Sequence, residues 1–160
     1  MIGIMIVAHG KLGESLIDCA THVMGSRPPL LQQFGIETKD DPTVILPIMQ
    51  KMVAELDEGD GVLILSDIYG ATPCNIVGKL LKPNHVEGIA GVNLPMLVRA
   101  LTYRNGDITK LAEKALSGGQ EGVMECWLRL HEPQHLLIAR WHTGFSPTGW
   151  APTKSEPCIL

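Results

Sequence analysis

The amino-acid sequence predicts an α/β protein built on an open, doubly wound parallel sheet. Residues 2–7 and 62–65 are unbroken apolar runs, which is typical of parallel strands covered on both faces. Between such runs, apolar residues recur at the spacing of an amphipathic helix. Strands that alternate with helices favour a parallel sheet, and right-handed connections place the helices on both of its faces.

The first half of the chain contains two strands and two helices. The strand at 2–7 leads into helical spacing over residues 12–23. A weaker apolar run at 30–36 predicts the second strand. Asp41 and Pro42 then offer an N-cap and a first helical residue, and the apolar stripe of the second helix follows them.

The third strand, at 62–65, is the clearest after the first. The helix that follows takes Thr72 as its cap and keeps apolar residues on one face as far as residue 81. A run at 86–92, weakened by glycines, predicts the fourth strand. The third strand therefore leads into the fourth through a helix, as a parallel arrangement requires.

Two more helices complete the predicted domain. Asn93 opens the first of them and Asp107 caps the second, because short polar side chains accept hydrogen bonds from the free amides of a helix start. Gly118 and Gly119 are predicted to break the second of these helices.

Composition excludes several classes of protein. The chain has 160 residues and a formal charge of −4, from 13 Lys and Arg against 17 Asp and Glu. This balance argues against nucleic acid or an anionic membrane as the main partner. The four cysteines form no CxxC pair, and the apolar N-terminus is too short for a signal peptide or a membrane span. We therefore expect a cytoplasmic protein without direct membrane insertion.

Composition changes near the C-terminus. All three tryptophans lie beyond Glu125, and the segment has no clear periodicity. We therefore expect an α/β domain over residues 1–125 and an atypical extension over residues 126–160. The histidines of this extension match no metal-binding spacing, so no metal site is expected.

Unusual residues follow two of the predicted strands. His9 ends the first, and Asp67 follows the third. In an open parallel sheet, ligands bind outside the carboxyl ends of the strands. If these strands are neighbours, His9 and Asp67 face each other, and the backbone amides of Gly70, Ala71 and Thr72 form an anion cradle at the start of the next helix.

This combination predicts phosphoryl transfer through a histidine. Asp67 would accept a hydrogen bond from Nδ1–H of His9, which leaves Nε2 free as the nucleophile. The cradle and the Thr72 hydroxyl would bind the phosphoryl oxygens, and no metal or other cofactor is needed. Each residue also has an ordinary structural reading, since a histidine can end a strand and Asp67 or Thr72 can cap a turn or helix. The prediction depends on their joint placement.

Three segments resemble the mannose-family IIA component of the bacterial phosphoenolpyruvate-dependent sugar phosphotransferase system. They are Ala8-His9-Gly10, DIYGATPCN at 67–75 and GVNLPM at 91–96. The resemblance covers about residues 1–125 and implies a four-stranded parallel sheet of order 2-1-3-4. It further implies a homodimer completed by an exchanged antiparallel C-terminal strand, although no such strand is recognisable beyond Glu125.

The resemblance also implies a function. His9 would accept a phosphoryl group from the carrier protein HPr and pass it to a separate IIB protein, with Asp67 orienting the histidine and Thr72 contacting the phosphoryl group. The chain would then be a phosphotransferase component in sugar uptake or in its regulation. The sequence does not identify the sugar.

Other functions stay open from the sequence. The phosphotransfer subunit of a dihydroxyacetone kinase resembles this fold and also uses a histidine near the first strand. A phosphorylated regulator without catalytic turnover would use His9 as well. A flavodoxin-like binding module is disfavoured, because the turn Gly10-Lys11-Leu12-Gly13 lacks a Ser/Thr-rich phosphate loop.

Overall fold

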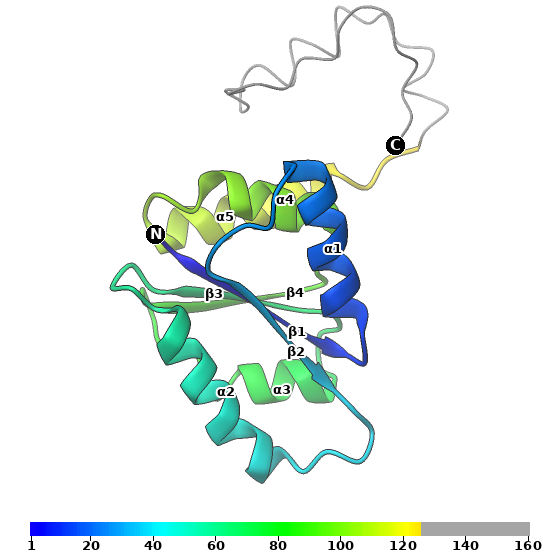
Figure 1. Ribbon diagram of the computed structural model, residues 1–160, viewed down its shortest axis with the longest axis vertical. Helices are drawn as coiled ribbons and strands as arrows, with labels where there is room; N and C mark the ends of the chain where they lie inside the picture. Colours follow the sequence, from blue (N-terminus) through cyan, green and yellow to red (C-terminus); the bar gives the residue numbers. More distant parts are fainter. Residues whose placement is uncertain (126–160) are drawn as a thin grey trace, which may run out of the picture. The chain divides into compact units, whose positions relative to one another are not determined.

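Within residues 1–125, four parallel strands form the sheet, in the order β2-β1-β3-β4 (Figure 1). The computed structural model describes residues 1–125, and Met1–Val123 is one compact unit. The strands are β1 Gly3–His9, β2 Leu31–Ile36, β3 Val62–Ser66 and β4 Val86–Ala90. The predicted fold class and strand order are therefore confirmed.

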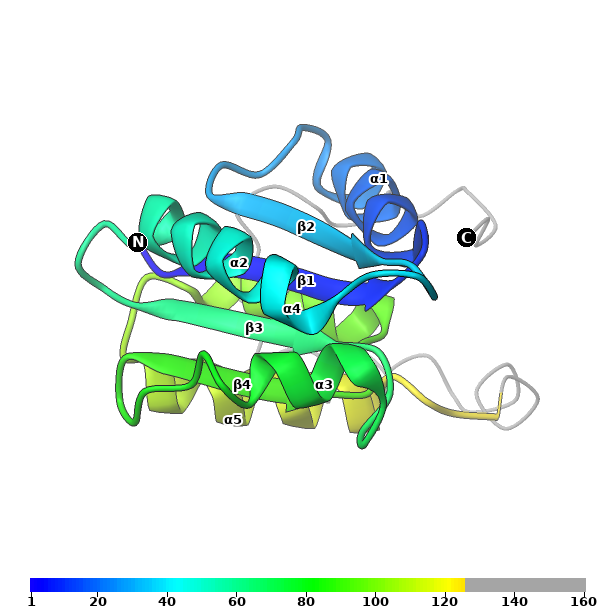
Figure 2. The same cartoon turned by 90° about the horizontal axis from the view of Figure 1, so that it is seen from below.

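Helices cover both faces of the sheet, as a doubly wound fold requires. α2 and α3 pack on one face, and α1, α4 and α5 pack on the other (Figures 1 and 2). The helices are α1 Leu12–Met24, α2 Pro42–Leu56, α3 Thr72–Val77, α4 Leu94–Tyr103 and α5 Ile108–Glu121.

β1 lies inside the sheet, and its alternate side chains enter two separate cores. Ile4 and Ile6 pack with residues of α1, α4 and α5, whereas Met5 and Val7 pack with residues of α2 and α3. All four are 0% exposed. Full burial of such a side chain contributes about 1.5–3 kcal/mol, so β1 is a firmly held strand that carries His9 at its end.

α5 continues through the two glycines that were predicted to break it. A Cβ at Gly118 would lie 2.6 Å from Arg99 Cβ, and one at Gly119 would lie 2.7 Å from Met96 Cε. Arg99 and Met96 belong to α4, so glycine lets the two helices approach closely. The prediction of a break was wrong, because the packing of α5 against α4 outweighs the low helix propensity of glycine.

α3 is shorter than the apolar spacing predicted. The helix begins at Thr72 with Ala71 as its N-cap, so Thr72 is not the cap, and it ends at Val77. Beyond that point the chain continues in tight turns, in which Leu80 N donates to Val77 O at 2.8 Å. Leu80 is still only 5% exposed. The apolar spacing therefore indicated which residues are buried, but the burial continues beyond the end of the helix. The fourth strand likewise ends before residue 92, at Ala90.

The predicted extension at 126–160 and the exchanged C-terminal strand lie outside the described residues, so both stay predictions. Among the helices of residues 1–125, none has the length and apolar character needed to cross a bilayer.

Candidate active site

Two neighbouring strands bring a histidine and an aspartate to the same edge of the sheet. β1 and β3 pair in parallel, with Val7 opposite Ser66. His9 ends β1, and Asp67 directly follows β3. The chain leaves β1 toward the face that carries α1 and leaves β3 toward the face that carries α3 (Figure 2). This edge is therefore a topological switch point, where open α/β sheets bind ligands.

The two side chains are in direct contact. His9 Nδ1 lies 2.7 Å from Asp67 Oδ2. The same oxygen accepts the backbone N–H of His9 at 2.8 Å, and Oδ1 accepts the backbone N–H of Ile68 at 2.8 Å. The Asp67 side chain is only 7% exposed, whereas the His9 side chain is 50% exposed. The carboxylate is thus fixed inside the site, and the imidazole faces solvent.

These contacts decide the charge of Asp67. Burial raises the pKa of its carboxyl, but hydrogen bonds from the backbone and ring of His9 and from the backbone of Ile68 lower it by more. The pKa of Asp67 therefore lies below its ordinary value, and the group is ionised at neutral pH. Because an ionised carboxylate only accepts hydrogen bonds, the tautomer of the neutral His9 ring that fits this contact has its proton on Nδ1 and its lone pair on Nε2.

The loop that follows Asp67 carries the three residues of the expected anion cradle. Gly70 adopts a φ of +81°, which glycine tolerates best and which turns the chain into α3. The Ala71 amide donates to Ile68 O at 3.4 Å, so this donor is already engaged. Within residues 1–125, the amides of Gly70 and Thr72 have no hydrogen-bond acceptor. Of the three amides expected to form the cradle, two are therefore free and one is engaged.

Asn75 stabilises this loop, a contact that the sequence analysis did not identify. Its Nδ2 donates to Gly70 O at 3.3 Å, across the first turn of α3. Asn75 is the last residue of the segment at 67–75 that resembles the family. Its place in that segment was the only indication in the sequence that it belongs to the site.

A second histidine–aspartate pair lies elsewhere in the fold. His85 Nε2 lies 2.6 Å from Asp57 Oδ2, joining the residue after α2 to the residue before β4. The two residues are 28 positions apart and follow no motif, so no sequence signal indicated the pair. In the part of the chain that the structure describes, no three His, Cys, Asp or Glu side chains gather as a metal site.

Comparison with known proteins identifies the family. The model of the family described as "PTS system fructose IIA component" matches residues 3–116. The mannose-specific EIIAB component of the phosphotransferase system (PTS) of Escherichia coli K12 is 32% identical over 125 residues, covering 76% of this chain and 38% of the relative. The fructose-specific EIIA component of Bacillus subtilis is 27% identical over 110 residues, covering 65% and 71%.

The fold has solved counterparts as well. A crystal structure of an EIIA component from Streptococcus agalactiae matches with a TM-score of 0.70 and 23% identity, covering 78% of this chain and 97% of that one. The chain belongs to the mannose/fructose family of PTS IIA components. It spans less than two fifths of the length of the E. coli relative.

Proposed function

We propose that this chain relays a phosphoryl group through His9, which receives it from HPr and passes it to a separate IIB protein. The contact between His9 Nδ1 and the ionised Asp67 carboxylate carries the proposal. In the neutral ring this contact selects the tautomer whose Nε2 carries the lone pair, on a half-exposed side chain, as a nucleophile requires.

The transfer step needs no external base. The Nε2 lone pair attacks the phosphorus, a new N–P bond forms, and the bond from phosphorus to the donor's histidine nitrogen breaks. The donor ring keeps that electron pair, and the proton on His9 Nδ1 stays in place. Positive charge that develops on the His9 ring is stabilised by Asp67 at 2.7 Å. Phosphoryl transfer depends mainly on such positioning and charge stabilisation.

The loop at the start of α3 would hold the transferring group. The free amides of Gly70 and Thr72 can donate to phosphoryl oxygens, and the exposed Thr72 side chain adds a hydroxyl. The Ala71 amide would join them only by giving up its 3.4 Å contact with Ile68 O. Neither Asp67 nor this loop requires a metal or another cofactor.

We also propose that the protein works as a homodimer. β4 is an outer strand of the sheet, and within residues 1–125 no further strand pairs with it. An exposed strand edge has free backbone donors and acceptors. The exchanged antiparallel strand implied by the family resemblance would satisfy them.

Phosphoryl labelling tests the relay. Phosphoenolpyruvate, the first enzyme of the system and HPr should label the full chain with an acid-labile phosphate on His9. A His9→Ala variant should take up no label, and equal labelling of this variant would disprove the assignment. Adding separate IIB proteins to the labelled chain then identifies the acceptor. A label that no IIB protein removes would favour a regulatory role.

A further inference from the structure

A buried hydroxyl at the end of β3 has no hydrogen-bond partner among residues 1–125. It belongs to Ser66, the last residue of the strand, which is 1% exposed. The backbone oxygen of Ser66, by contrast, accepts the amides of Gly91 and Val92, both at 2.9 Å. An unpaired buried hydroxyl costs free energy, so a molecule that supplies a partner for it gains from binding there.

Ser66 lines a cavity of about 390 Å³ between α3 and β4. Gly88 and Ala90 of β4 lie opposite Ile64 and Ser66 in the β3–β4 pair, on the sheet face that α3 covers. These two residues have little or no side chain, and α3 has only 6 residues, so space remains beside Ser66. The volume falls within the range of small-molecule pockets, roughly 300–1,000 Å³.

The lining of the cavity defines the kind of molecule that fits. Its walls include the apolar side chains of Val77, Leu81 and Ile89, and among residues 1–125 no charged side chain lines it. Ser66 is the only buried polar side chain of this lining. A charged group would lose hydration in such a cavity without gaining an ionic partner. The cavity therefore favours an uncharged molecule.

We propose that this cavity binds an uncharged, mainly apolar small molecule with one hydroxyl, carbonyl or amide group, which pairs with Ser66 Oγ. The site is distinct from the candidate active site, because neither His9 nor Asp67 lines the cavity. Gly70 and Asn75 line it and also belong to the loop beside His9. A molecule in the cavity therefore contacts this loop without contacting the histidine.

Phenol and toluene are matched probes of the cavity, because they are similar in size and only phenol can pair with a hydroxyl. Each is titrated into the isotope-labelled full chain, and the backbone amide signals are followed by NMR. Both should shift the signals of Gly78 and Gly88, which line the cavity, and leave those of Gly25 and Gly106, which do not. For molecules this small, we expect dissociation constants that are roughly millimolar.

Removing the hydroxyl tests the role of Ser66. Ser66→Ala should weaken the binding of phenol about two- to tenfold, as the loss of one ordinary hydrogen bond does, and leave the binding of toluene within about twofold. In urea this variant should be at least as stable as the wild type, because it loses only an unpaired buried hydroxyl. Ser15→Ala removes an exposed hydroxyl of α1 and should change neither binding nor stability.

Filling the cavity tests its location. Ala90→Leu should abolish the binding of both probes, because Ala90 lies opposite Ser66 and lines the same cavity. Ala54→Leu adds the same side chain at an exposed position of α2 and should leave binding unchanged. His9→Ala should also bind both probes with the wild-type affinity, because His9 lies outside the cavity lining.

Several outcomes would overturn the proposal. If neither probe shifts the signals of Gly78 and Gly88, the cavity holds only solvent. If Ser66→Ala binds phenol as the wild type does, or His9→Ala loses binding, the probe lies elsewhere. A marked loss of stability in Ser66→Ala would show that the hydroxyl already has a partner. None of these measurements depends on phosphoryl transfer, so the cavity and the relay are tested separately.

Discussion

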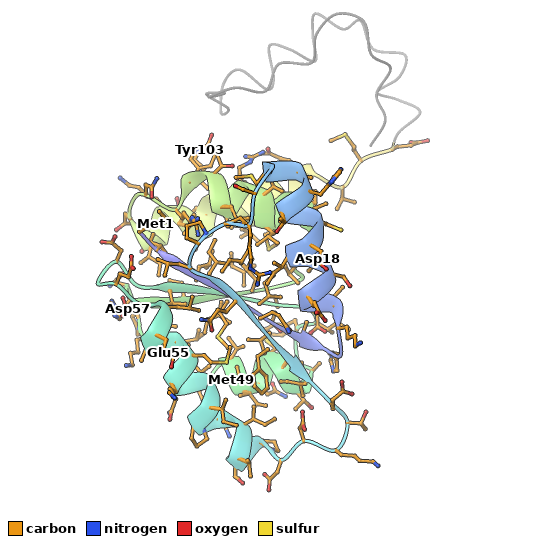
Figure 3. The ribbon with its side chains drawn as sticks, in the orientation of Figure 1. Met1, Asp18, Met49, Glu55, Asp57 and Tyr103 are labelled. Carbon is orange, nitrogen blue, oxygen red and sulfur yellow. The ribbon has the colours of Figure 1, made fainter. Side chains whose placement is uncertain are left out.

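The two histidine–aspartate pairs of this domain have nearly the same contact and different surroundings. His9 meets Asp67 through Nδ1 at 2.7 Å at the carboxyl ends of the strands, and His85 meets Asp57 through Nε2 at 2.6 Å near their amino ends. The histidines are similarly exposed, at 50% and 45%. Figure 3 shows Asp57 at the end of α2, on the side of the molecule where Met1 lies. The contact with a carboxylate is therefore common to both pairs, and their surroundings distinguish them.

The neighbours of each carboxylate make the difference. Asp57 Oδ1 accepts the amides of Gly59 and Gly61, so the carboxylate organises the turn between α2 and β3. The His85 backbone also accepts the amide of Val62 at the start of β3. The amides of Gly59, Gly61 and Val62 are thus used within the fold. At the other end, the loop before α3 keeps free amides, and these can bind an anion.

The largest expected effect is on phosphoryl labelling. His9→Ala should reduce labelling to background, whereas His85→Ala should be labelled at the wild-type rate, because only the first pair lies at the carboxyl ends of the strands, beside the loop before α3. Time courses with phospho-HPr measure both. Label on His85 in the wild type would show that contact with a carboxylate is sufficient for phosphorylation and that the surroundings of the two pairs do not decide their reactivity.

Exchanging each carboxylate for an amide should separate chemistry from stability. Asp67→Asn should slow transfer by roughly 10²-fold or more, because an amide no longer fixes the proton on Nδ1 or stabilises a charged ring. Asp57→Asn should leave transfer unchanged and lower the free energy of unfolding by about 1–3 kcal/mol, through lost hydrogen bonds. Single-turnover kinetics and urea unfolding measure the two effects. A wild-type transfer rate in Asp67→Asn would remove this residue from the mechanism.

Acid should weaken the turn that Asp57 holds. Burial raises the pKa of this carboxyl, but hydrogen bonds from Gly59, Gly61 and His85 outweigh that effect and place the pKa below its ordinary value. A carboxyl with a lowered folded-state pKa stabilises the fold above its unfolded pKa of about 3.9, and this contribution is lost as pH falls through the folded value. The free energy of unfolding should therefore decrease below about pH 4, and less steeply in Asp57→Asn.

Urea unfolding at several pH values measures this dependence. Asp18→Asn is the matched control, because it removes an exposed carboxyl of α1 (Figure 3). If Asp18→Asn flattens the pH profile as much as Asp57→Asn does, the assignment to Asp57 is wrong.

The sequence predicted the pair of His9 and Asp67 but not the pair of His85 and Asp57, and the reasons are physical. His9 and Asp67 were predictable because apolar runs mark strand ends, and parallel strands bring their ends together. The pair of Asp57 and His85 lies outside strands and depends on how a turn and a loop meet in space. The continuity of α5 through Gly118 was likewise missed, because it depends on a close contact with α4.

The smallest expected effect is that of Asn75, which supports the loop beside His9 and Asp67. Its amide donates to Gly70 O at 3.3 Å and stabilises the turn that exposes the free donors. Asn75→Ala should slow transfer by about two- to tenfold, the worth of one ordinary hydrogen bond, with little change in unfolding because the side chain is exposed. Asn105→Ala removes an exposed amide after α4 and serves as the control. If both variants transfer at the wild-type rate, the loop holds its shape without Asn75. The backbone turn at Gly70 then suffices to keep the amides beside His9 free.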